Sequence, residues 1–338
     1  ATAYDTTSHA TVIRVRDAAG APWRDLLTMP FERALFPGQT AGGSLIAGFA
    51  ADGRSLYVHS AMGTGYGRLV RIDARTGGEV EVVAAHPRSD LPVDLEQAVL
   101  FDPPTLRVLA VQFDDGSPAW VFHDARTRDD FSRIHHAAPG FPRVLSQDAA
   151  GRRWVVSVSR SDAPDAFVLY DRETRVVTPL YSAQPALAVH VLAKKQVVTI
   201  RARDGLPLVS YLTLPPGVPA RGLPLVLLVH GGPWYRDSDV FDPEVQLLAN
   251  RGYAVLQVNY RGSIGFGLSY YNAGDGQWGR GMQEDLYDAV RWAVSKGIAD
   301  PKRVASMGWS GGGYATLTAL WQRPELFACG VDGVGPGD

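Results

Sequence analysis

The stretch "RVASMGWSGGGYATL" (303–317) determines how the C-terminal half of the chain is interpreted. It begins as an apolar run, reaches Ser310 between Gly308 and Gly312, and continues as an apolar segment. A Gly-x-Ser-x-Gly pattern between a strand and a helix is typical of a tight turn that exposes the serine hydroxyl above a sheet. A side chain at either glycine would collide with the neighbouring strand or helix. We therefore predict a strand before this turn, a helix after it, and a nucleophile at Ser310.

A second motif, "VHGGPW" (229–234), ends a long apolar run and supplies another part of such a site. Acyl transfer needs N–H donors directed at the oxyanion that develops during attack. One donor is expected from Gly311, the residue after the nucleophile, and the other from Gly232 or its neighbour Gly231. Glycine can turn its amide inward because no Cβ obstructs the substrate. We interpret His230 as a residue bonded within this loop rather than as the general base.

The second half of the chain alternates apolar runs with helical segments. Continuous apolar runs are typical of strands buried on both faces of a parallel sheet, and they occur at 223–232, 253–262, 303–309 and 327–334. Segments with helical periodicity and stop signals lie between and after them, at 244–252, 282–297 and 312–323. The stretch 195–217 predicts two strands around an Asp204-Gly205 turn. Residues 191–338 are therefore predicted to form an α/β domain with a mostly parallel sheet, incomplete at its C-terminus.

The first half consists of short strands, and none of it shows a clear helical period. The predicted strands are 55–60, 67–73, 107–113, 119–124, 153–159 and 167–171. A repeat accompanies them: "DART" at 73–76 and 124–127 and "DRET" at 171–174 each follow an apolar strand. A partial copy ends in Asp17. A period of about 50 residues with about four strands is the signature of a β-propeller blade.

We therefore predict that residues 1–190 form an N-terminal all-β propeller, of which about three and a half blades are visible. Each repeated aspartate is expected to close a strand and to form the turn into the next one, rather than to bind a ligand. Propellers usually close with four to eight blades, so we expect the chain to be truncated at its N-terminus.

Composition narrows the functional classes. The chain has 338 residues, 46% hydrophobic and 20% charged, and a net charge of −2, which gives no bias toward nucleic acid or a membrane surface. Cys329 is the single cysteine, so an internal disulfide framework and a cysteine-based zinc site are excluded. No apolar run reaches the length of a membrane span. The sequence implies no cofactor, and "GSIGFG" (262–267) is rejected as a nucleotide motif because no helix opens directly behind it. The composition favours the cytoplasm, with a bacterial periplasm as the alternative, and it leaves the oligomeric state open, a homo-oligomer included.

With these residues identified, the C-terminal half resembles the prolyl oligopeptidase family of serine peptidases, and its acylaminoacyl-peptidase-like branch in particular. The resemblance is carried by the stretches 230–234, 251–267, 276–294, 297–320 and 324–335. It implies a propeller followed by an α/β-hydrolase domain, and a serine peptidase that cleaves short peptides admitted by the propeller. It also implies Ser310 as nucleophile and the amides of Gly311 and Gly232 as oxyanion donors.

The resemblance has consequences for the residues around the nucleophile. The family usually has Gly-x-Ser-Tyr-Gly-Gly at the elbow, whereas here Gly311 stands in place of the tyrosine, so a side chain near the substrate is lost. Trp309 is bulkier than the residue usual before the serine and is expected to narrow the cleft. Trp234 and Tyr260 are expected to line the site, and Arg261 is expected to have a structural role.

The partners of Ser310 are absent from the sequence. In this fold the acid and then the histidine follow the serine along the chain. After Ser310 the sequence contains Glu325, Asp332 and Asp338 and no histidine, and we interpret Asp332, within a predicted strand, as structural. We therefore expect this chain to be truncated at its C-terminus and inactive alone. An esterase with the same nucleophile and a non-catalytic propeller scaffold remain the alternatives.

Overall fold

The computed structural model describes residues 1–8, 10–30 and 45–337, and the chain divides into two compact units. Unit 1 contains residues 1–158, 166–181 and 265–269, and unit 2 contains residues 159–165, 182–264 and 270–338. The main change of unit thus falls near the predicted domain boundary at residue 190, with two short segments exchanged. Among the described residues, no helix is both long enough and apolar enough to cross a membrane.

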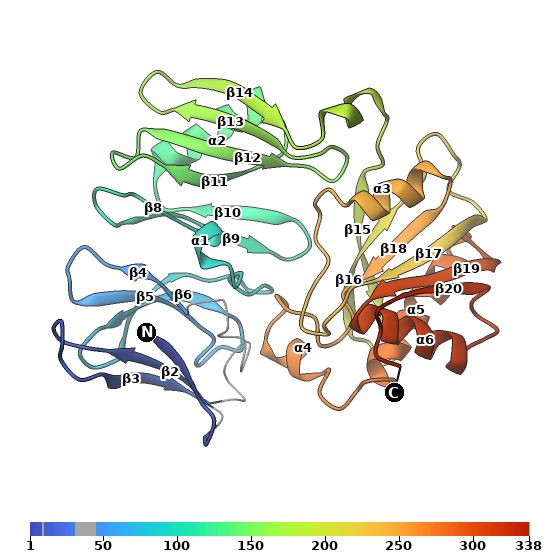
Figure 1. Ribbon diagram of the computed structural model, residues 1–338, viewed down its shortest axis with the longest axis horizontal. Coiled ribbons are helices and arrows are strands. Elements are labelled where there is room, and N and C mark those ends of the chain that lie inside the picture. Colours follow the sequence, from blue (N-terminus) through green and yellow to red (C-terminus); the bar gives the residue numbers. More distant parts are fainter. Residues whose placement is uncertain (9, 31–44, 338) are drawn as a thin grey trace. The chain divides into compact units, whose positions relative to one another are not determined.

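Unit 1 is built, in its described residues, from four antiparallel sheets, each made of strands consecutive in the sequence (Figure 1). The first two sheets contain β1 (Thr2–Asp5), β2 (Ala10–Val15), β3 (Arg24–Met29), and then β4 (Ile46–Phe49), β5 (Ser55–Ser60), β6 (Arg68–Asp73) and β7 (Glu79–Ala84). The other two contain β8 (Val99–Phe101), β9 (Val108–Asp114), β10 (Pro118–Phe122), and then β11 (Phe141–Gln147), β12 (Arg153–Ser159), β13 (Ala166–Asp171) and β14 (Val176–Ser182). The short helix α1 (Leu95–Ala98) precedes β8. Every strand predicted in the first half is present.

The repeated aspartates do not all act alike. Asp73 and Asp171 form the predicted turns, because each carboxylate accepts hydrogen bonds from the backbone N–H groups two and three residues ahead. Asp124 instead caps helix α2 (Ala125–Ala137), where it accepts bonds from the N–H and hydroxyl of Thr127. The predicted turn at Asp124 is therefore wrong, as is the absence of a helix from this half.

The residues that follow each aspartate explain the difference. An Asx turn and a helix N-cap use the same bond from the third residue, so the aspartate alone does not choose between them. After Asp73 the chain reaches Gly77 at φ +74°, which breaks the helical path. After Asp124 come Phe131 and Ile134, three residues apart, and both are buried in the core of this part of the unit.

Helix α2 is anchored by a buried polar network. The carboxylate of Asp130 accepts hydrogen bonds from the Tyr170 hydroxyl at 2.7 Å and from Nε of Arg172 at 2.7 Å. The Arg172 guanidinium lies over the ring of Trp154, 4.4 Å from its centroid. The side chains of Asp130 and Arg172 are only 4% and 9% exposed, so each charge depends on the other for compensation.

Unit 2 contains a six-stranded mixed sheet with the order β15-β16-β18-β17-β19-β20. Its strands are β15 (Lys195–Arg201), β16 (Pro207–Thr213), β17 (Leu223–Val229), β18 (Ala254–Val258), β19 (Ala299–Trp309) and β20 (Cys329–Gly333). The pairs from β18 through β17 and β19 to β20 are parallel, as expected from the apolar runs, and β15 and β16 add an antiparallel edge. The helices are η2 (Pro185–Val189), α3 (Pro243–Asn250), α4 (Leu268–Asn272), α5 (Gly281–Ser295) and α6 (Gly311–Gln322).

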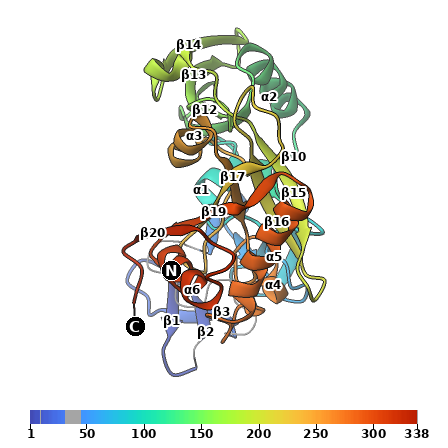
Figure 2. The ribbon, with the colours of Figure 1, turned by 90° about the vertical axis from the view of Figure 1, so that its right-hand side faces the viewer.

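Helices cover both faces of this sheet (Figures 1 and 2). Alternate residues of a strand point to opposite faces, and paired residues of neighbouring strands share a face. Leu228, which pairs with Met307, packs with Val245 of α3 on one face. The preceding residue, Ser306, bonds Thr316 of α6 at 2.9 Å on the other face. The sheet is therefore enclosed as a parallel sheet requires, and its carboxyl edge presents the turns after β17 and β19.

Candidate active site

Ser310 stands alone between a strand and a helix, as predicted. Strand β19 ends at Trp309, helix α6 begins at Gly311, and Ser310 has φ 54° and ψ −120°. A positive φ strains any residue other than glycine, and strain of this kind is typical of a nucleophile elbow. The turn is held by the Ser310 N–H, which donates to Gly333 O at 2.8 Å, and by the Tyr314 N–H, which donates to Ser310 O. The residue remains exposed.

The flanking glycines are required by space. A Cβ added to Gly308 would lie 2.5 Å from the carbonyl oxygen of Gly312, and one added to Gly312 would lie 2.1 Å from Val229 O. Both contacts are with backbone atoms, which cannot move without displacing the strand or the helix. Any side chain at these positions would therefore push α6 away from the sheet.

The glycine loop after β17 lies directly against the nucleophile. A Cβ on Gly231 would be 3.6 Å from Ser310 Cβ, and a Cβ on Gly311 would be 3.0 Å from the amide nitrogen of Gly232. Gly232 has φ +112°, which only glycine adopts without strain. The structure thus brings Gly231, Gly232, Ser310 and Gly311 together, although they are about 80 residues apart in sequence.

His230 is enclosed within this loop and does not bond to the serine. Its Nδ1 lies 2.8 Å from Gly231 O and its Nε2 lies 3.0 Å from the Ser263 hydroxyl. Its ring stacks on Tyr260 with centroids 4.5 Å apart. Burial lowers the pKa of His230 to about 4. A neutral imidazole with both nitrogens engaged agrees with the structural role inferred from sequence.

Three aromatic residues predicted to line the site occupy different positions. Tyr260 is buried and donates its hydroxyl to His230 O at 3.1 Å. Trp309 is half exposed, and its indole N–H donates to Glu244 in the first turn of α3 at 2.8 Å. Trp234 is 44% exposed and stacks on Tyr271. Tyr260 therefore supports the loop from within, whereas the two tryptophans offer surface beside it.

Arg261 and Asp332 have structural partners. The Arg261 guanidinium donates to both carboxylate oxygens of Asp285, which is almost fully buried, and also to Asp204. Asp332 lies in β20 and accepts the N–H of Gly335 at 2.9 Å. These contacts agree with the structural roles expected for both residues.

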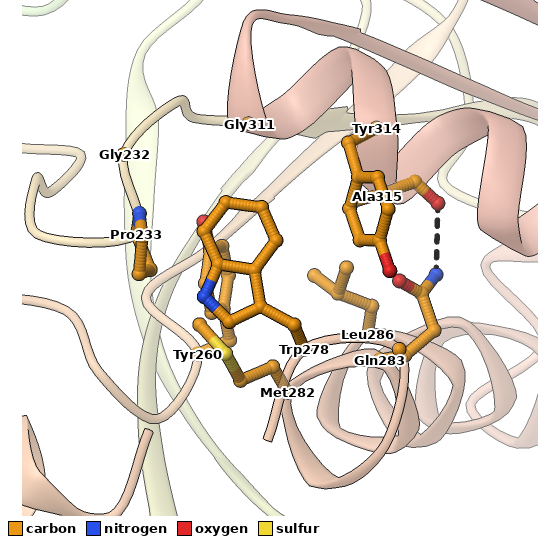
Figure 3. A pocket seen from close by; sticks show the side chains of 11 residues that line it. Gly232, Pro233, Tyr260, Trp278, Met282, Gln283, Leu286, Gly311, Tyr314 and Ala315 are labelled. Atoms are coloured by element: carbon orange, nitrogen blue, oxygen red, sulfur yellow. Dashed lines mark hydrogen bonds between the residues drawn. The ribbon is translucent and has the colours of Figure 1, made fainter. Parts of the chain in front are cut away.

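A cavity that sequence reasoning missed lies next to Gly232 and Gly311 (Figure 3). It is small and partly open to solvent, and it is lined by Gly232, Pro233, Tyr260, Trp278, Gly279, Met282, Gln283, Leu286, Gly311, Tyr314 and Ala315. None of these side chains is charged. Gln283 donates to Ala315 O at 2.9 Å and so joins α5 to α6 at the base of the cavity. Met282, Gln283 and Leu286 of α5 border this space, which only the fold shows.

The same region has no arrangement suited to a metal. Within residues 1–8, 10–30 and 45–337, no group of three or more His, Cys, Asp or Glu side chains is placed to bind an ion. In the same ranges, no hydrogen bond joins a histidine to the Ser310 hydroxyl, and both ring nitrogens of His230 are engaged with Gly231 and Ser263. The described geometry of the site is an exposed serine at a strained turn with glycine backbone packed beside it.

Comparison with known proteins agrees with this geometry. The sequence profile of the prolyl oligopeptidase family matches residues 239–338. The chain is 41% identical over 331 residues to dipeptidyl aminopeptidase BIII of Pseudoxanthomonas mexicana. This alignment covers 96% of this chain and 46% of the relative. It is 39% identical to dipeptidyl peptidase family member 6 of Caenorhabditis elegans, over 71% of this chain and 35% of the relative.

Solved structures extend the similarity to nearly the whole chain. A puromycin-hydrolyzing peptidase of Mycobacterium tuberculosis superposes with a TM-score of 0.74 at 25% identity, over 98% of this chain and 50% of that one. Dipeptidyl peptidase 4 of Porphyromonas gingivalis superposes with a TM-score of 0.76 at 16% identity, which shows the shared fold. The chain spans about half the length of these relatives. The family profile and these similarities together show that residues 239–338, which contain the elbow, belong to the prolyl oligopeptidase family.

Proposed function

We propose that the protein is a serine peptidase that hydrolyses peptide bonds of short peptides through an acyl-enzyme on Ser310. The observation that carries this proposal is the strained, exposed serine at the end of β19 with Gly231, Gly232 and Gly311 packed around it. A glycine-rich turn that served only to pack a helix on a sheet would not need a second glycine loop against the serine.

The chemistry assigned to these residues is acyl transfer in two steps. The Ser310 oxygen attacks the carbonyl carbon of the scissile bond while a base takes its proton, and the carbonyl oxygen becomes an oxyanion. The amides of Gly311 and Gly232 stabilise that charge. The amine leaves with a proton, and water then attacks the ester to release the acid and restore the serine. We assign the base and its acid to residues of the full-length protein outside this chain.

The sheets of unit 1 support a preference for peptides over simple esters. Consecutive antiparallel sheets of three or four strands are the units from which a propeller is built, and we propose that these sheets are its blades. In the resemblance described above, a propeller restricts entry to short chains. Relatives named dipeptidyl aminopeptidase and acylamino-acid-releasing enzyme are consistent with peptide substrates.

The test uses the full-length protein and a fluorophosphonate probe, which reacts only with an activated serine. We expect one label, mapped by peptide mass to Ser310, and none in Ser310→Ala. Matched peptide anilide and ester substrates then separate a peptidase from an esterase. Absence of label from a folded full-length protein would refute the proposal and favour a non-catalytic scaffold.

A further inference from the structure

The loop that leaves the glycine motif is held at its centre by one aspartate. Residues 233–242 connect Gly232 to helix α3, and Asp237 lies midway along them. The Asp237 N–H donates to Asn259 Oδ1 at 2.8 Å, and Gln257 Nε2 donates to Asp237 Oδ1 at 2.8 Å. Gln257 and Asn259 are 2% and 0% exposed at the end of β18. The loop is therefore attached to the sheet through Asp237.

The cluster around this attachment has more buried acceptor oxygens than hydrogen-bond donors. Gln257 Nε2 also donates to Asp242 Oδ2 at 3.3 Å, so both carboxylates fix the orientation of the amide. Three buried oxygens of this cluster have no hydrogen-bond partner among the described residues: Asp237 Oδ2, Asp239 Oδ1 and Gln257 Oε1. An ionised carboxylate only accepts hydrogen bonds, whereas a protonated one also donates one. Buried acceptors without donors are costly, so protonation of a carboxyl in this cluster would supply a hydrogen-bond donor that the cluster lacks.

We propose that Asp237 is a positioning residue that holds the loop after Gly232 when its carboxyl is protonated and loosens it when ionised. We call this protonation-dependent attachment of residues 233–242 the latch. The latch does not depend on whether the protein is an enzyme, and the inference rests on the proposed function only where it concerns the reaction.

Charged and titratable groups face Asp237 from every element around it. They are Lys195 from β15, Tyr211 from β16, Tyr260 after β18, Asp242 at the start of α3, and Arg236 and Asp239 of the same loop. Lys195 is 4% exposed, donates to Ser238 O at 3.1 Å and lies 5.7 Å from the Tyr211 ring centroid. Its charge favours ionisation of Asp237, and Asp242 opposes it. Burial is the largest influence and raises the pKa of Asp237 to about 7.

The direction of the pH effect follows from this raised pKa. The closed loop binds the proton more tightly than an open loop, in which the carboxyl has its ordinary value of 3.8. Stabilisation of the closed loop is therefore greatest at low pH and is lost as the pH rises to about 7, above which it changes no further. Because the loop begins at Gly232, its release would disturb one of the two amides assigned to the oxyanion.

Hydrogen exchange of the full-length protein tests the latch without requiring activity. After correction for intrinsic exchange rates, we expect protection of the 233–242 amides to fall about tenfold between about pH 6 and about pH 8.5. In Asp237→Asn, whose amide supplies donors without charge, protection should stay constant over that range. Asp275→Asn, an exposed aspartate outside the cluster, serves as the matched control and should behave like the wild type.

Two outcomes would overturn the proposal. Wild-type protection in this loop that is independent of pH would exclude the latch, whatever the variants do. A pH dependence in Asp237→Asn equal to that of the wild type would assign the proton to another group. Loss of fluorophosphonate labelling at every pH, with the exchange pattern as expected, would refute only the proposed function.

Discussion

Replacement of Gly232 by alanine provides the sharpest test of the glycine loop. Gly232 has φ +112°, and an added Cβ would lie 2.6 Å from the amide nitrogen of Trp234 and 3.1 Å from that of Tyr235. Both atoms belong to the backbone of the same loop, so the loop must change shape to accommodate the methyl group. The Gly232 amide would then leave its position beside Gly311.

The expected magnitude follows from the role assigned to that amide. Removal of one oxyanion donor costs about 10²- to 10³-fold in rate, or about 2.7–4 kcal/mol of transition-state stabilisation. We therefore expect the second-order rate of fluorophosphonate labelling of the full-length Gly232→Ala variant to fall about 100-fold. The strained backbone should also lower the free energy of unfolding by about 1–2 kcal/mol.

A control separates backbone strain from the effect on the site. Gly252, after helix α3, has φ +90°, and an added Cβ would meet no atom within 4 Å. Gly252→Ala should lose a similar amount of stability while labelling at the wild-type rate. Two results would show that Gly232 is not an oxyanion donor. One is labelling at the wild-type rate by a folded Gly232→Ala protein. The other is a labelling rate that falls as much in Gly252→Ala as in Gly232→Ala.

Three further predictions concern stability. Ser310→Gly should abolish labelling yet raise the free energy of unfolding by about 1 kcal/mol, measured in urea, because glycine relieves the strain at φ 54°; a destabilised variant would argue against a strained elbow. Asp130→Ala should lower the free energy of unfolding by about 3–5 kcal/mol, because the buried Arg172 charge loses its partner. Asp129 is the exposed neighbour, and the Asp129→Ala variant should have a free energy of unfolding within about 0.5 kcal/mol of wild type. Burial lowers the pKa of His59 to about 4, so its neutral form is stabilising above about pH 6.5 and the protein should lose stability as the pH falls toward 4. His59→Leu should remove about 2 kcal/mol of the loss between about pH 7 and about pH 5 in urea titrations, and an unchanged loss would contradict this account.

The elbow could be predicted from sequence because its causes are local. A strand that enters a tight turn and leaves as a helix needs glycine two residues before and two residues after the serine, and those contacts recur wherever the turn occurs. A Cβ on Gly308 would meet the Gly312 carbonyl within the turn itself, and one on Gly312 would meet Val229 O on the neighbouring strand of the sheet. The same holds for the parallel strands, since burial on both faces leaves a continuous apolar run.

The repeated tetrapeptide shows where local information ends. "DART" at 73–76 forms a turn and "DART" at 124–127 begins a helix, although the aspartate makes the same bond in both. The burial of Phe131 and Ile134, and the pairing of Asp130 with Arg172, stabilise the helix through residues about 40 positions away. Sequence periodicity over so short a segment could not reveal these partners.

The Ser310 turn, the glycine loop and the alternation of strands and helices could be predicted from the sequence alone, because each leaves a pattern of glycines or apolar residues within a short segment. Only the tertiary structure decided the neutral, enclosed state of His230, the cavity beside Gly311 and the donor-poor cluster around Asp237. Each of these features is formed by segments far apart in the sequence, and burial there changes pKa values and the supply of hydrogen-bond donors in ways that depend on distant residues.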